Sequence, residues 1–186
     1  ARKDGVPIIR KEMESFLRVM LSIKKPMRIL ELGTAVGYSA ILMSEYIDEK
    51  GQIITIENYD KRIPIAKENI KKAGRENVIK LLEGDAMEIM PTLESNRFDF
   101  VFMDSAKSKY IVFLPDVLKH LKVGGVIVFD DVFQGGDIVK PIEEVRRGQR
   151  TIYRGLQRLF DATLDNPNLT ATLLPLSDGL LMIRKN

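Results

Sequence analysis

Residues 27–40 read MRILELGTAVGYSA, and this stretch decides the fold. Residues 27–32 form a short apolar run that is typical of a buried strand, and Gly33 ends it. Residues 37–47 follow as a predicted helix, with Ile41, Leu42 and Tyr46 at core spacing. A strand that leads through a glycine turn into a helix is the first unit of an α/β fold.

The alternation of strand and helix continues along the rest of the chain. Further strands are predicted over residues 52–57, 78–82, 98–103, 126–129, 169–174 and 180–183, and further helices over residues 60–73, 110–121 and 150–164. Asp60 is expected to cap the first of these helices and Gly74 to end it. The last two strands must pair antiparallel, because only a short turn around residues 177–179 joins them. The prediction is an α/β, doubly wound, Rossmann-like sheet of seven strands, mostly parallel with an antiparallel C-terminal strand.

Length and composition indicate one globular domain over residues 1–186. Apolar residues make up 45% of the chain and charged residues 30%, and the net charge is only +3. No apolar run approaches the roughly 20 residues that a membrane span needs, and the N-terminus does not resemble a signal peptide. We therefore expect a cytoplasmic protein. Because the chain lacks an initiator Met, residues upstream are expected to be missing.

The near absence of sulfur and imidazole ligands narrows the possible chemistry. The sequence has no cysteine and a single histidine, His120. Disulfides, Cys-zinc sites and thiol nucleophiles are excluded, and a His-rich metal site or Ser-His-Asp triad is disfavoured. His120 is expected at a helix C-terminus before two glycines. A metal here would need oxygen ligands, which favours Mg²⁺, Ca²⁺ or Mn²⁺.

In a doubly wound sheet, ligands bind beyond the carboxyl ends of the strands, so the residues just after each strand are the candidates. The turn after the first strand has Ala35 and Tyr38 where the phosphate-binding fingerprint needs glycines. It suits a cofactor with an amino-acid head better than a pyrophosphate, with Glu31 available for the amine. The alternative is a plain strand-to-helix turn.

The next two strand ends suit a nucleoside. Glu57 ends the second strand, where a carboxylate can accept both ribose hydroxyls, and Asn58 or Tyr59 would then lie near adenine. After the third strand, Asp85 can accept from the adenine amino group and Ala86 leaves room for the ring. The alternatives are an exposed acid at a strand end for Glu57 and a helix N-cap for Asp85.

Three carboxylates follow the fourth and fifth strands. Asp104, Asp130 and Asp131 would repel one another unless a cation lay between them, and three oxygen ligands suit a hard divalent metal. The alternative is that Asp131 caps its loop and points away. Lys107 follows Asp104 by three residues and is a candidate general base that accepts a proton from a hydroxyl; its alternative is a solvated surface lysine.

The ordered set of these motifs resembles the metal-dependent class I O-methyltransferases, which include catechol and caffeoyl-CoA O-methyltransferases. The match covers nearly the whole chain, from Val6 to the turn at residues 177–179, although the family usually has Asn where this chain has Asp131. The resemblance implies S-adenosylmethionine and Mg²⁺, or Mn²⁺ or Ca²⁺, as cofactors, and a homodimer. Catalysis would fall to Lys107 and Asp104, and the metal to Asp104, Asp130 and Asp131. The implied cofactor contacts are Val6, Glu31, Gly33, Thr34, Gly37, Ser39, Glu57, Asn58, Asp85, Ala86 and Asp104.

Residues 6–10 (VPIIR) and 149–152 (QRTI) are most similar to the bacterial branch that methylates 5-hydroxyuridine at the tRNA wobble position. An arginine cluster points the same way, because it could hold phosphates near the anticodon. Its members are Arg146, Arg147, Arg150, Arg154 and Arg158.

Alternatives remain open at this point. The arginines could belong to a solvated helix face, and the acceptor could be a small catechol-like or phenylpropanoid molecule. An NAD-dependent oxidoreductase and a non-catalytic binding module are further alternatives. The turn residues argue against the first, and the co-occurrence of Lys107 with the aspartates argues against the second.

Overall fold

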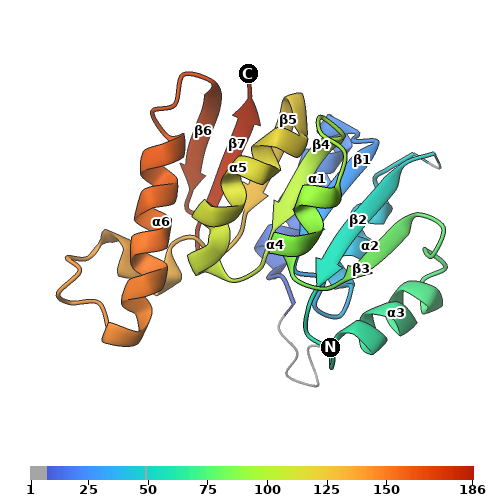
Figure 1. Cartoon of the computed structure of the whole chain (residues 1–186), viewed down its shortest axis with the longest axis horizontal. Helices are drawn as coiled ribbons and strands as arrows, with labels where there is room; N and C mark the ends of the chain where they lie inside the picture. Colours follow the sequence, from blue (N-terminus) through green and yellow to red (C-terminus); the bar gives the residue numbers. More distant parts are fainter. Residues whose placement is uncertain (1–7, 49) are drawn as a thin grey trace.

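The computed structural model describes residues 8–48 and 50–186, which form one mixed seven-stranded sheet (Figure 1). Its strands are β1 (Arg28–Leu32), β2 (Gln52–Glu57), β3 (Ile79–Glu83), β4 (Phe98–Met103), β5 (Leu121–Phe129), β6 (Leu169–Leu174) and β7 (Leu180–Lys185). Their order is β3-β2-β1-β4-β5-β7-β6. The first five strands pair in parallel, and β7 runs antiparallel to both of its neighbours. The predicted fold class is confirmed.

Helices cover both faces of the sheet. The helices are α1 (Lys11–Lys24), α2 (Tyr38–Ser44), α3 (Ile63–Lys72), α4 (Ala86–Ile89), α5 (Tyr110–His120) and α6 (Arg150–Thr163). Side chains of α1, α2 and α3 join the apolar core on one face, and those of α5 and α6 join the core on the other. Figure 1 shows α5 and α6 in front of the sheet. Within the described residues, no helix is both long and apolar enough to cross a membrane.

The central strands are buried on both faces, as their continuous apolar sequences predict. Along β4, Phe100 and Phe102 enter the core under α1 and α2, whereas Val101 and Met103 enter the core under α5 and α6. Because successive side chains of a strand alternate between faces, both layers are anchored to the same strand. Packing on both faces therefore fixes the position of the carboxyl end of β4.

The main differences between the structure and the sequence-based expectations lie at α1, α3 and β5. Helix α1 was not predicted, although Met13, Leu17 and Leu21 form its buried stripe. The predicted cap by Asp60 is wrong: α3 begins at Ile63 after a backbone turn, and it has no side-chain cap. Strand β5 begins at Leu121 rather than at residue 126, because the chain pairs with β4 before and after a register shift.

Candidate active site

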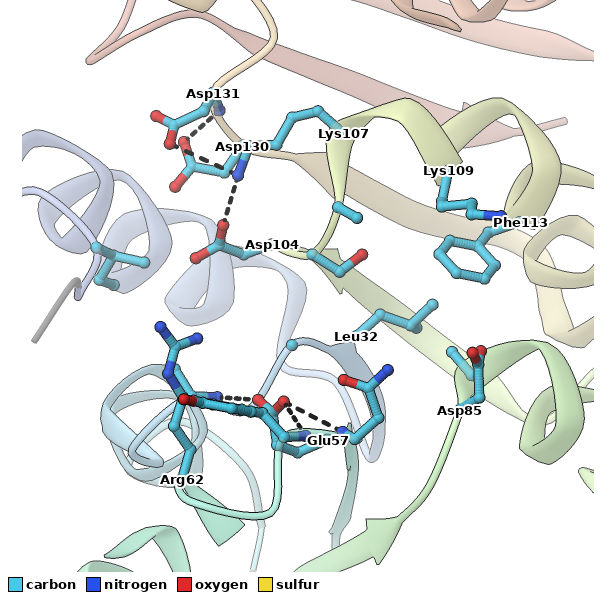
Figure 2. A pocket seen from close by; sticks show the side chains of 18 of the residues that line it. Leu32, Glu57, Arg62, Asp85, Asp104, Lys107, Lys109, Phe113, Asp130 and Asp131 are labelled. Carbon is cyan, nitrogen blue, oxygen red and sulfur yellow. Dashed lines mark hydrogen bonds and ion pairs between the residues drawn. The ribbon is translucent and has the colours of Figure 1, made fainter. Parts of the chain in front are cut away.

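A cavity of about 660 Å³ opens beyond the carboxyl ends of the parallel strands. It lies where the strand order reverses between β1 and β4, as expected for a doubly wound sheet. Its lining combines the segments after β1 to β5, most of them labelled in Figure 2, with residues 8–10 directly before α1. The predicted site residues that line it are Gly33, Glu57, Asn58, Asp85, Ala86, Asp104, Lys107, Asp130 and Asp131.

One end of this pocket carries the three aspartates. Each of Asp104, Asp130 and Asp131 offers a carboxylate oxygen, and these oxygens lie within 4.8 Å of one another. The backbone N–H of Asp131 donates to Asp130 Oδ1 at 2.8 Å, which orients the Asp130 carboxylate. A hard divalent cation fits this donor set, because all three ligand atoms are oxygens and can converge on one ion. The Asp131 side chain does not point away from its neighbours.

The pKa values of the clustered aspartates are raised. Burial raises the pKa of Asp130 to about 7, and the nearby charges of Asp131 and Asp104 add to the rise. Burial likewise raises the pKa of Asp131. Without a cation, ionisation of these two carboxylates therefore destabilises the folded protein.

Lys107 supplies a positive charge beside the cluster. Its Nζ lies 3.0 Å from Asp104 Oδ1 and 3.6 Å from Asp131 Oδ2. Burial opposes its charge, but the neighbouring aspartates together raise the pKa of Lys107. The lysine is therefore not a solvated surface residue, and its amine lies within reach of anything bound at the three carboxylates.

The two strand ends that carry the aspartates are joined by a buried tyrosine. The Tyr110 hydroxyl lies 2.9 Å from the carbonyl oxygen of Met103 and 3.2 Å from that of Asp130, and it donates between them. Met103 is the last residue of β4, and Asp130 directly follows β5. From the sequence, Tyr110 was predicted only as part of a helix, because residue spacing does not reveal that its hydroxyl contacts two strands.

The other end of the pocket is built around Glu57 and Asp85. Glu57 accepts the backbone N–H groups of Ala35 at 2.7 Å, Asn58 at 3.1 Å and Tyr59 at 3.0 Å. Its carboxylate is therefore held rigidly at the pocket wall with lone pairs to spare. Asp85 accepts the N–H of Met87 at 2.8 Å, so the predicted N-cap is confirmed, and it lines the pocket as well.

Four other predicted cofactor residues lie behind this wall rather than in it. Glu31 is fully buried and accepts the hydroxyls of Ser39 and Thr55, and the Thr34 hydroxyl bonds to that of Thr55. Burial raises the pKa of Glu31 to about 7. Gly37 precedes α2 in a left-handed conformation. Direct contact of these residues with a cofactor stays a prediction, and Val6 lies outside the described residues.

The pocket also contains residues that the sequence analysis did not single out. Arg10, Arg62, Lys109 and Phe113 line it, and Figure 2 labels the last three. Arg10 and Arg62 directly precede helices α1 and α3. A position immediately before a helix, at the strand-end edge of the sheet, was the available signal, but α1 was not predicted and α3 was expected to start earlier.

The arginine cluster lies at the start of α6, on the same edge of the sheet as the pocket (Figure 1). Arg150 is occupied, because its guanidinium donates to the carbonyl oxygens of Val145 and Glu143. The other members, Arg146, Arg147, Arg154 and Arg158, are exposed. Among the described residues that line the pocket, none belongs to this cluster.

A sequence model of the O-methyltransferase family matches residues 5–186. The chain is 30% identical over 180 residues to a caffeoyl-CoA O-methyltransferase of Medicago sativa, covering 91% of this chain and 71% of the relative.

Two solved structures are also similar. A Podospora anserina methyltransferase with SAH bound has 29% identity and a TM-score of 0.85, covering 96% of this chain and 80% of that one. The Streptomyces achromogenes O-methyltransferase TomG, in complex with SAM, has 25% identity and a TM-score of 0.88, covering 100% and 85%. The match to the family model spans almost the entire chain, and this protein belongs to the O-methyltransferase family.

Proposed function

We propose that this chain transfers a methyl group from S-adenosylmethionine to the hydroxyl of a small catechol-like or phenylpropanoid acceptor, with a divalent cation as cofactor. The observation that carries the proposal is the convergence of Asp104, Asp130, Asp131 and Lys107 at one end of a pocket whose other end presents Glu57 and Asp85. One cavity thus contains a set of carboxylates that can bind a metal ion and, beside it, a wall that can bind a nucleoside.

The cofactor would bind along the wall formed by the ends of β1, β2 and β3. Glu57 suits the ribose hydroxyls, because three backbone N–H groups fix its carboxylate. Asp85 and Ala86 suit the adenine end. SAM and SAH in the similar structures from Streptomyces achromogenes and Podospora anserina support this assignment. The sulfonium methyl of this cofactor is the electrophile that an acceptor oxygen attacks.

The cation would be held by Asp104, Asp130 and Asp131. Mg²⁺ is the first choice, with Mn²⁺ and Ca²⁺ as alternatives, because the donors are all carboxylate oxygens. A bound dication lowers the pKa of a coordinated hydroxyl and fixes its position. The aspartates would hold the cation that positions the acceptor, and a dication there would offset the carboxylate charges that raise the pKa of Lys107. Lys107 in its neutral form would then be the chain's own group placed to take the hydroxyl proton.

The nature of the acceptor is supported by the relatives. Several are caffeoyl-CoA O-methyltransferases, from Medicago sativa and Populus trichocarpa among others, and match 91% of this chain. A ring with two adjacent oxygens suits a cluster that gathers three ligands around one point, since both oxygens could reach the same ion.

A second candidate acceptor is 5-hydroxyuridine at the wobble position of tRNA. The specific observation in its favour is the group of exposed arginines at the start of α6, on the edge of the sheet where the pocket opens. Arg146 and Arg147 would bind backbone phosphates, whose contacts dominate nucleic-acid affinity. The hydroxyl and the neighbouring carbonyl of 5-hydroxyuracil also form a pair of adjacent ring oxygens.

The experiment that tests both candidates is methyl transfer from radiolabelled S-adenosylmethionine. Purified protein would be given 3,4-dihydroxybenzoate, caffeoyl-CoA or tRNA rich in 5-hydroxyuridine, each with MgCl₂ or with EDTA. Label in a small acceptor, lost with EDTA, supports the main proposal. Label found only in tRNA favours the second candidate. Label in neither, or transfer that EDTA does not affect, contradicts the proposed chemistry.

A further inference from the structure

Two pocket arginines have no role in the chemistry described so far. Arg10 and Arg62 line the cavity from positions directly before α1 and α3. Among residues 8–48 and 50–186, no carboxylate lies within ion-pair distance of either guanidinium. Because neither guanidinium forms a close ion pair with these carboxylates, its N–H donors are available to an anion that enters the pocket.

Arg62 is held in a defined position. Its guanidinium carbon lies 5.4 Å from the centroid of the Tyr59 ring, and the residue is half-buried. Figure 2 shows its nitrogen end directed toward the part of the pocket that holds the Asp104 carboxylate. A guanidinium stacked on an aromatic face keeps its N–H donors free at the edge, which suits bidentate recognition of a carboxylate or phosphate.

Arg10 lines the same pocket as the three aspartates, and its side chain is exposed. Its guanidinium is therefore accessible to an acceptor that enters the pocket. Together, the two arginines place positive charge beside both the reaction centre and the cofactor wall.

The ligand of these arginines must be an anion. The metal ion and the sulfonium centre are both positive, and neither would be attracted to a guanidinium. The carboxylate of the cofactor is one possible source, but the Arg62 guanidinium is directed toward the Asp104 carboxylate, at the end of the pocket where the acceptor would bind (Figure 2). We infer that Arg10 and Arg62 bind an anionic group, a carboxylate or a phosphate, on the acceptor itself. This inference rests on the proposed function and narrows its acceptor to an anionic one.

The test uses pairs of acceptors that differ only in the anionic group: 3,4-dihydroxybenzoate against catechol, and 5-hydroxyuridine 5′-monophosphate against 5-hydroxyuridine. The variants are Arg10→Gln and Arg62→Gln, with Arg62→Lys to keep the charge and Arg75→Gln as a matched control outside the pocket. We expect each Gln variant to raise KM for the anionic member roughly tenfold or more and to leave KM for the neutral member unchanged. Arg62→Lys should recover part of the loss, and the Arg75 variant should match the parent.

Three outcomes would overturn the inference. Equal losses on both members of a pair would show a general structural role, and unchanged values would show no role. Weaker SAM binding by calorimetry, with the preference for anionic acceptors intact, would assign the arginines to the cofactor carboxylate. If the parent protein methylates neither member of either pair, the proposed function fails separately. The inference is then decided by calorimetric binding of each pair in the presence of SAH, where the same Gln variants must lose the preference for the anion.

Discussion

Gly33 faces the backbone of Asp104 so closely that a β-carbon on Gly33 would lie 2.0 Å from the Asp104 carbonyl oxygen. The contact joins the turn after β1 to the end of β4, which are the two sides of the topological switch point. Gly33 also has a φ of +101°, a backbone conformation that L side chains rarely adopt. The absence of a side chain at Gly33 therefore allows the two segments that line the pocket to lie in contact.

Gly33→Ala should disrupt both stability and the pocket. The added methyl group must push the end of β4 away, so we expect a loss of about 3 kcal/mol or more in the free energy of unfolding and loss of SAH binding. Urea denaturation and calorimetry would measure the two effects. Gly74→Ala is the matched control: Gly74 also has positive φ, at +65°, but nothing lies within 4 Å of its β-carbon position. It should lose only about 1 kcal/mol and bind SAH normally.

Glu31 should make the unliganded protein less stable as the pH rises. Its pKa is raised by burial to about 7 in the folded state, from an ordinary value of 4.5, so the folded protein holds the proton more tightly than the unfolded chain. This contribution is complete below pH 4.5 and is lost as the pH rises through about 7, which amounts to about 3 kcal/mol.

Urea denaturation between pH 5 and pH 8 would measure this slope. Glu31→Gln should flatten it, while the exposed Glu76→Gln should keep the parent slope. Asp130 contributes a slope of the same sign, so the difference between parent and Glu31→Gln isolates Glu31. A parent whose stability rises across this range would contradict the assignment.

Asp131 should lower the stability of the metal-free protein and raise its affinity for a metal ion. Because burial and neighbouring carboxylates raise its pKa, Asp131→Asn should raise the melting temperature without metal. The same change should weaken Mn²⁺ binding roughly tenfold, since the site loses a charge but keeps an oxygen ligand. Asp131→Ala, which removes the ligand, should weaken it further. Calorimetric Mn²⁺ titrations give the order, and equal affinities for parent and Ala variant would exclude Asp131 as a ligand.

Asp178 should increase metal affinity by positioning the loop after Asp131, without binding the ion itself. Its carboxylate accepts the Gly135 N–H at 2.8 and 3.0 Å, and its carbonyl accepts the Phe133 N–H at 2.8 Å. These bonds tie the loop after Asp131 to the turn between β6 and β7. Asp178→Ala should therefore reduce Mn²⁺ affinity while SAH affinity stays at the parent value. Asp178→Asn retains one acceptor oxygen and should recover most of the loss.

The sheet could be predicted well because its strands are short, apolar and separated by glycines. Strands at residues 98–103 and 169–174 match β4 and β6 to the residue. The predicted strand at residues 126–129 was too short because Gly124 and Gly125 disfavour a strand. In the structure, β5 pairs with β4 on both sides of a register shift, and this pairing overrides that preference. Helix α1 was missed because apolar residues such as Val19 and Ile23 also occur on its exposed face and blur the buried stripe.

Proximity at the site could be predicted where topology alone decides it. The ends of neighbouring parallel strands meet, so Asp104, Asp130 and Asp131 had to lie together. The buried network of Glu31, Ser39 and Thr55 was not predictable, because it depends on which face each side chain takes. The role of Tyr110 depends equally on three-dimensional packing. Homodimer formation stays a prediction.

The most direct test is a crystal structure of the protein grown with MnCl₂ and SAH, with anomalous diffraction data to locate manganese. The proposed function requires one manganese peak bound by oxygens of Asp104, Asp130 and Asp131, with SAH in the same pocket against Glu57. SAH in place with Asp104 and Asp131 still paired to Lys107, and no manganese among the three carboxylates, would contradict metal-assisted methyl transfer by this chain.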